Sequence, residues 1–160
     1  MPLKLDLKCG EKMIVNGAVL ENVGPNAKIL IHNLATVLRE KEILTQEDAA
    51  TPASRVYFSL QCAYMFSEAR EEHLKNFNRY LNDYLNACPS ATEIAEIIRG
   101  HIEKENFYKG LKSSRNLIAH EVRTLDEFNN GMDKLSQIAQ DAEKEEAEAT
   151  NDDEQETTGT

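Results

Sequence analysis

Residues 3–44 constrain the fold most strongly, because short apolar runs alternate there with turn residues. Leu3, Leu5 and Leu7 alternate with polar residues, as in a strand with one buried face. Asn16-Gly17 lies between two further apolar runs, and this dipeptide is a strong hairpin signal in that setting. The block ends at a charged quartet, residues 39–42. Five short strands are predicted, forming a small, strongly twisted antiparallel sheet or half-barrel.

Helices are predicted after this block. Thr51-Pro52 is a suitable helix start, with Thr as N-cap and Pro in the first turn. The apolar segment that follows is expected to continue as a buried helix, although residues 55–60 could also begin as a strand. Apolar residues at steps of three and four predict an amphipathic helix from about Glu68 to Cys88, which Pro89 ends.

Residues 90–93, Ser-Ala-Thr-Glu, form a capping-box sequence that predicts another helix start. A break near Glu105-Asn106 would divide the following stretch into two helices, the second ending near His120. Apolar positions from Leu125 to Ala142 could form a last helix to about Glu148. Beyond Thr150 almost nothing can be buried, which predicts disorder.

The predicted fold class is α+β. A β-rich unit covers residues 1–48, a helical part packed on or next to it covers 49–140, and an acidic tail, expected to be disordered, covers 141–160. The net charge of −10 is uneven, because residues 141–160 contain nine acidic residues and one lysine. The first 44 residues contain six basic and five acidic residues. Any binding of phosphate must therefore come from local clusters of basic residues.

The chain is expected to act in the cytoplasm without a cofactor. No secretory signal and no membrane-spanning apolar run is present in the sequence. The three cysteines, Cys9, Cys62 and Cys88, are widely spaced, which argues against a disulfide framework or a zinc site. We find no nucleotide-binding loop and no hydrolase or metalloprotease motif, so we expect no enzyme activity.

Five separated segments together carry a family resemblance: MPLKLDLKCGEK, NGAVLEN and LREKEIL in the first 44 residues, TPASRVYF at residues 51–58 and FYKGLKSSRNLIAHE at residues 107–121. In this order they resemble the FlbT family of bacterial flagellin-synthesis regulators. The resemblance covers residues 1–121 in order. It implies a cytoplasmic protein that acts on flagellin mRNA at its 5′ untranslated region and can repress or support flagellin production.

A first candidate RNA-binding cluster lies in the β-rich block. Residues 3–44 also have a spacing similar to the carbon storage regulator family of RNA-binding proteins, in which the first and last strands of two swapped chains lie side by side and bind a GGA loop. This resemblance implies that Leu5 lies in the first contact strand and that Arg39 matches an essential arginine, although Leu7 stands where that family has an arginine. The cluster consists of Lys4, Leu5, Lys8 and Lys12 at the sheet edge, with Arg39 and Lys41 from the closing strand. In the alternative interpretation, the lysines are ordinary solvated residues that protect strand edges.

A second candidate cluster is Lys109, Lys112 and Arg115, which follow Phe107 and Tyr108. Basic side chains interleaved with aromatic rings can pair with phosphates and stack on unpaired bases. A solvated helix face is the simpler alternative. Arg55 is a third candidate, better explained as a structural ion-pair partner.

The predicted function is post-transcriptional regulation of flagellin synthesis through binding of flagellin mRNA, which alters its translation and decay. The alternative is a protein-binding flagellar assembly factor or flagellin chaperone that affects the mRNA only indirectly. Flagellin or another flagellar regulatory protein is then the expected partner, and self-association into a homo-oligomer stays open. No membrane partner is expected.

Overall fold

The computed structural model describes the backbone of residues 1–155 and the side chains of residues 1–149. Two compact units divide the chain, and the first covers Met1–Ala119. It contains all five strands and most of the helices, so the predicted β-rich and helical segments share one unit. The second unit begins at His120 and is described separately below.

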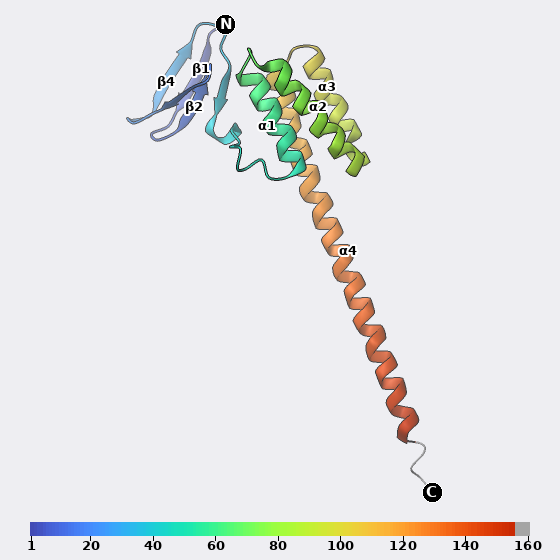
Figure 1. Cartoon of the computed structure of the whole chain (residues 1–160). Coiled ribbons are helices and arrows are strands. Elements are labelled where there is room, and N and C mark those ends of the chain that lie inside the picture. Colours follow the sequence, from blue (N-terminus) through green and yellow to red (C-terminus); the bar gives the residue numbers. More distant parts are fainter. Residues whose placement is uncertain (156–160) are drawn as a thin grey trace. The chain divides into compact units, whose positions relative to one another are not determined.

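The predicted five strands and their antiparallel pairing are confirmed, but they form two sheets (Figure 1). Strand β1 (Leu3–Leu7) pairs with β4 (Ala27–Ile31). In the second sheet, β2 (Lys12–Val15) lies between β3 (Ala18–Glu21) and β5 (Val37–Arg39). The expected single sheet or half-barrel does not form, since β1 and β4 pair only with each other, and side chains cover the outer edge of β5.

Two side chains satisfy the backbone at this edge. The hydroxyl of Tyr64 accepts a hydrogen bond from Val37 N–H (3.1 Å) and donates one to Val37 C=O (3.5 Å). The carboxylate of Glu42 accepts from Arg39 N–H (2.9 Å). Glu42 belongs to the 3₁₀ turn η1 (Glu40–Glu42), so Lys41 lies in this turn and not in the closing strand as predicted.

Strand β5 joins the two hydrophobic cores because successive side chains of a strand point to opposite faces. Val37 packs with Leu5, Leu7 and Met13 in the β core. The next residue, Leu38, packs among the buried side chains of the helices. The two faces of one short strand therefore connect the β part with the helical part.

The hairpin between β2 and β3 has the turn that its sequence predicts. Asn16 and Gly17 both have positive φ, 50° and 82°, as a two-residue type I′ turn requires. Asn16 also accepts a hydrogen bond from Thr36 N–H (2.9 Å) through its side chain, which ties the turn to the segment before β5.

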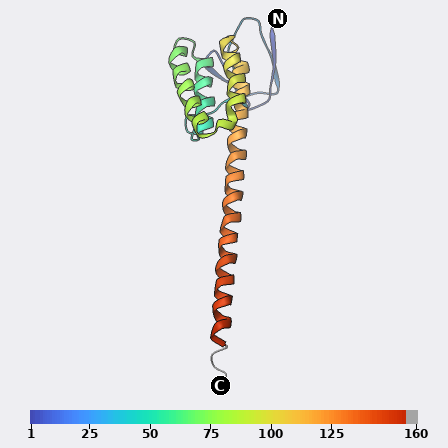
Figure 2. The same ribbon diagram turned by 90° about the vertical axis from the view of Figure 1, so that its right-hand side faces the viewer.

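Helix α1 (Pro52–Met65) begins as predicted. The hydroxyl of Thr51 accepts a hydrogen bond from Ser54 N–H (3.2 Å), and Pro52 occupies the first turn. Helix α2 (Arg70–Ala87) follows and lies beside α1 (Figures 1 and 2). Residues 55–60, for which a strand was the alternative, lie within α1 and are helical throughout, as the helix prediction expected.

Helix α3 (Thr92–Glu103) begins without the predicted capping box. Its N-cap is Ala91, and no side chain caps this end. Residues Pro89–Ala91 instead form the 3₁₀ turn η2, and the Thr92 hydroxyl donates a hydrogen bond back to Pro89 C=O (2.6 Å). The proline therefore ends α2 as predicted, but the polar residues after it stabilise the connecting turn.

Helix α4 (Phe107–Gln155) starts after the predicted break, where Glu105 has a positive φ of 57°. The expected end near His120 is absent, and the two helices predicted on either side of it are joined in one. Residues 141–155 are helical although the acidic tail was expected to be disordered, and residues 156–160 of that tail lie outside the described residues. No helix in the described part of the chain is both long and apolar enough to cross a membrane.

Gly17 and Gly100 offer a matched test of backbone conformation. An added Cβ would meet nothing within 4 Å at either site, but only Gly17 has a positive φ. Gly17→Ala should therefore lower the free energy of unfolding by about 1 kcal/mol, since alanine is strained there. Gly100→Ala, within α3, should raise it by up to about 1 kcal/mol. Chemical denaturation followed by circular dichroism measures both, and changes of the same sign would contradict the turn assignment.

Candidate nucleic-acid interface

An open groove of about 570 Å³ lies in the first unit. It lies between the β2–β3 turn, the segment before β5, the end of α1 and the start of α4. Three aromatic and two cationic side chains line it together with polar and apolar neighbours: Asn16, Leu34, Ala35, Thr36, Tyr64, Arg70, Glu105, Asn106, Phe107, Tyr108 and Lys109. We call this hollow the aromatic groove.

Tyr108 is the most firmly positioned of the exposed rings in this groove. Its hydroxyl donates a hydrogen bond to Glu42 Oε1 (2.7 Å), and its ring centroid lies 5.8 Å from that of Tyr64. The ring stays 37% exposed, with Lys112 Nζ 5.8 Å from its centroid. Partial burial, followed by the hydrogen bond to the Glu42 carboxylate, raises the pKa of Tyr108 to about 12. Tyr108 is therefore a neutral, fixed ring at physiological pH.

Arg70 supplies a cation that the sequence did not single out. Its Nε donates a hydrogen bond to Ala63 C=O (3.0 Å), which leaves the guanidinium 4.5 Å from the centroid of the Phe107 ring. A cation over an aromatic face is favourable, so Phe107 and Arg70 hold each other in the groove wall. Lys109 is exposed nearby on the first turn of α4.

Arg115 and Lys41 are brought together from positions 74 residues apart. The guanidinium of Arg115 donates a hydrogen bond to Lys41 C=O (2.8 Å) and lies 5.9 Å from the Tyr57 ring centroid. Both residues line a second hollow of about 370 Å³. The structure thus unites Lys41, predicted in the first cluster, with Arg115 of the second.

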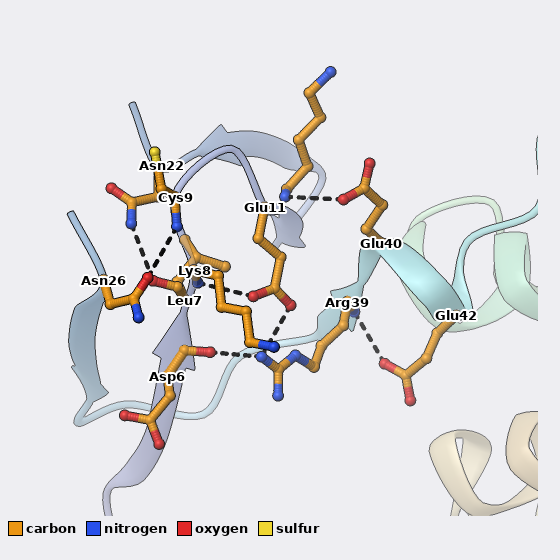
Figure 3. Close-up of polar contacts among 11 residues, drawn as sticks. Asp6, Leu7, Lys8, Cys9, Glu11, Asn22, Asn26, Arg39, Glu40 and Glu42 are labelled. Atoms are coloured by element: carbon orange, nitrogen blue, oxygen red, sulfur yellow. Dashed lines mark hydrogen bonds and ion pairs between the residues drawn. The ribbon is translucent and has the colours of Figure 1, made fainter. Parts of the chain in front are cut away.

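Arg39 has internal partners (Figure 3). Its guanidinium donates to Asp6 C=O (2.5 Å) and to Glu11 Oε1 (3.0 Å), and its side chain is only 33% exposed. Its Nε is buried without a hydrogen-bond partner. The positive charge of Arg39 is therefore paired within the protein, and its side chain links β5 with β1.

The other residues of the first cluster divide between surface and core. Lys4 and Lys8 are exposed, and Lys4 stands opposite Leu30 in the β1–β4 pair. Leu5 is 9% exposed and packs in the β core. Any contact of Leu5 with RNA would therefore have to use its backbone.

Sequence reasoning found three groove residues, Phe107, Tyr108 and Lys109, and missed Arg70 and Tyr64. Arg70 begins a helix whose periodicity reveals only its packing face, and Tyr64 stands in a nearly uniform apolar segment. No local sequence pattern indicates that either residue lines the groove, because their place there depends on the packing of α1 against the start of α4.

Charge separates sharply between the two units. Residues 1–119 contain fifteen basic and fifteen acidic residues, whereas residues 120–160 contain three basic and thirteen acidic residues. The unit that contains the groove is therefore electrically balanced, and the second unit carries the whole net charge of −10. Across the described residues, no group of three or more His, Cys, Asp or Glu could hold a metal ion.

Comparisons with known proteins give a consistent result. The family model described as "Flagellar protein FlbT" matches residues 3–125. The flagellum biosynthesis repressor protein FlbT of Caulobacter vibrioides is 34% identical over 134 residues, covering 82% of this chain and 95% of the relative. A probable flagellum biosynthesis repressor, FlbT 1 of Bradyrhizobium diazoefficiens, is 38% identical over 124 residues, covering 77% of this chain and 84% of the relative. No solved structure matches.

Glu42 should be important for stability, because both oxygens of its buried carboxylate accept hydrogen bonds. Glu42→Ala leaves the donors Arg39 N–H and Tyr108 O–H without these acceptors. We expect a loss of about 2–3 kcal/mol in the free energy of unfolding. Glu47→Ala, in the exposed connector that follows, should change it by less than about 0.5 kcal/mol. Equal losses in urea titrations would refute this role for Glu42.

Glu11 should make stability depend on acid pH. The Lys8 backbone N–H donates a hydrogen bond to Glu11 Oε2 (2.9 Å), and this bond is the main cause of the lowered pKa of Glu11. Partial burial acts to raise that pKa, and the hydrogen bond and charge of Arg39 act to lower it further. A carboxyl group whose pKa is lower in the folded chain than in the unfolded chain stabilises the fold at any pH above the unfolded value, about 4.3 for Glu. This stabilisation is lost as the pH falls through the pKa of the folded chain.

Wild type should therefore be more stable than Glu11→Gln at pH 7, and this difference should shrink below about pH 4.3. Urea unfolding at a series of pH values measures the difference. A difference that stays constant or grows on acidification would show that the Glu11 charge does not contribute.

Proposed function

This chain belongs to the FlbT family of flagellar proteins, and on that premise we propose that it represses flagellin synthesis by binding the 5′ untranslated region of flagellin mRNA directly. Binding there would block translation and expose the mRNA to decay. The relatives are named as repressors of flagellum biosynthesis, which supports the regulatory part of the proposal. On this proposal the protein acts in the cytoplasm and catalyses no reaction.

The observation that carries the RNA-binding part is the aromatic groove. Single-stranded RNA is bound by proteins that stack its bases on aromatic rings and pair its phosphates with nearby cations. Tyr108 supplies an exposed ring that the hydrogen bond to Glu42 holds in place. Arg70 and Lys109 supply positive charge at the same hollow. A volume of about 570 Å³ is in the range of sites that hold small organic molecules, so a base can enter it.

Lys112, Arg115 and Lys41 extend this surface. Lys112 lies over the Tyr108 ring, and Arg115 joins the second hollow, which Lys41 also lines. These cations could guide the phosphates on either side of a stacked base. Lys4 and Lys8 would contact RNA phosphates outside the groove. Arg39 would act mainly by holding β5 and β1 together.

The balanced charge of residues 1–119 predicts a modest dependence on salt. Each phosphate contact to a single strand contributes about −0.7 to the slope of log affinity against log salt concentration. Two or three contacts, from Arg70, Lys109 and Lys112, would give a slope of about −1.4 to −2.1. Steeper slopes are typical of proteins that bind nucleic acid chiefly through charge.

Three variants test the groove against flagellin leader RNA. Tyr108→Ala removes the ring and should weaken binding about 5- to 150-fold, the range for losing one stacked base. Tyr108→Phe keeps the ring and removes only the hydroxyl, so it should bind within about threefold of wild type despite lower stability. Lys109→Ala should reduce the salt slope by about 0.7. Lys75→Ala, exposed on α2, is the control that should change neither quantity.

Fluorescence anisotropy with labelled leader RNA at several salt concentrations measures wild type and these four variants, and circular dichroism verifies their folding. Equal losses for Tyr108→Ala and Tyr108→Phe would refute stacking. If wild type binds the RNA but no variant binds it differently, the groove is not the binding site. If wild type binds flagellin and not RNA, the flagellin-chaperone function would replace this proposal.

A further inference from the structure

The second unit presents a row of large apolar side chains on α4. From His120 onward the helix exposes half or more of almost every one of them, whereas a soluble helix normally buries such residues against the core. The exposed fractions are 53% for Val122, 53% for Leu125, 65% for Phe128, 49% for Met132, 63% for Leu135 and 65% for Ile138. We call these six residues the apolar row.

The spacing of the apolar row is the same in both chain directions. Successive members are separated by three, three, four, three and three residues, so the row is symmetric about residue 130. In a heptad assignment, Leu125 and Met132 occupy position a, and Phe128 and Leu135 occupy position d. Such a row matches a second copy of itself when the two helices run in opposite directions.

Charged residues avoid the side of the helix that a partner would cover. Between residues 122 and 138 the charged residues all fall at the outer heptad positions b, c and f: Arg123, Asp126, Glu127, Asp133 and Lys134. The positions that flank the a and d residues are otherwise uncharged, with Thr124, Asn129, Gly131 and Ser136. Two copies could therefore pair here without burying a charge or facing like charges.

We propose that this protein forms a homodimer in which the apolar rows of two copies pair as a short antiparallel coiled coil. The two-fold axis passes near Asn130. Leu125 of one copy then lies level with the partner's Leu135, and Phe128 lies level with the partner's Met132. Val122 and Ile138 fall at the flanking positions e and g, so they border the seam while the four a and d residues form its centre.

The acidic end of α4 favours the antiparallel direction. Asp141, Glu143, Glu145, Glu146 and Glu148 follow the apolar row, with Lys144 as the single cation among them. A parallel pair would place these carboxylates side by side. In the antiparallel pair the two copies of Glu143 are 26 residues apart along the helix axis, roughly 39 Å at 1.5 Å per residue. This separation far exceeds the screening length of about 8 Å in physiological salt.

The area available suits a weak dimer. Six side chains of roughly 150 Å² each, about half exposed, present roughly 500 Å² on one copy. Pairing would bury roughly 1,000 Å² in total, near the lower limit for a specific interface. The family model ends at residue 125, so most of the row lies beyond the part of the chain that defines the family.

Sedimentation velocity of the full chain, from about 1 to 200 µM, tests whether it pairs. Wild type should pass from monomer to dimer in the micromolar range that an interface of this size supports. The double variant Phe128→Gln with Leu135→Gln should stay monomeric throughout. The matched control, Glu127→Gln with Lys134→Gln, changes the outer side without altering net charge and should dimerise like wild type. A wild-type chain that stays monomeric, or one that associates only with flagellin, would overturn the proposal.

Cysteine cross-linking tests the direction of pairing, in a background where Cys9 and Cys88 are replaced by serine. Leu125→Cys and Leu135→Cys variants should cross-link when mixed and oxidised. Neither should cross-link alone, because the two copies of residue 125 lie ten residues, roughly 15 Å, apart along the axis. Cross-linking of each variant with itself would show a parallel pair and would overturn the antiparallel arrangement.

Discussion

The buried carboxylate of Glu42 is the interaction on which the arrangement of the first unit depends. A buried charge is costly unless hydrogen bonds satisfy it, and here one oxygen accepts from β5 at Arg39 N–H and the other from the Tyr108 hydroxyl on α4. The backbone carbonyl of Glu42 accepts from Tyr57 of α1. One short turn therefore ties a strand to two helices. The exposed ring of Tyr108 has a fixed position in the groove because of this connection.

The balance of charge explains how an acidic protein can still offer a surface for RNA. The first unit contains equal numbers of basic and acidic residues, so the average property of the chain, a pI near 4.9, describes neither unit. Within the first unit, the cations divide into two kinds. The charge of Arg39 is paired internally with Glu11, whereas Lys109 and Lys112 are exposed near the Tyr108 ring. Recognition would accordingly rely on stacking more than on charge.

The sequence predicted elements that depend on local chemistry. Asn16-Gly17 specified its turn, and Thr51-Pro52 specified the start of α1. Predictions failed where a distant residue decides the outcome. The strands form two sheets, and the outer edge of β5 is occupied by Tyr64, a residue of α1 that no pattern within the strands could indicate. Likewise, no pattern within residues 3–44 could show that Glu11 and the Asp6 carbonyl bind the Arg39 guanidinium. The contact of Arg39 with RNA stays a prediction. The candidate groove depends on the same kind of long-range packing.

The contact of Tyr64 with β5 also bears on aggregation. An open strand edge is a template on which another chain can add a strand, and proteins usually block it with a charge, a proline or a bulge. Here a phenol hydroxyl both accepts from Val37 N–H and donates to Val37 C=O, which are the two bonds that a neighbouring strand residue would make. A single side chain thus imitates a sixth strand. The Val37 backbone groups are thereby taken, so a strand of another copy finds no free donor or acceptor at this residue.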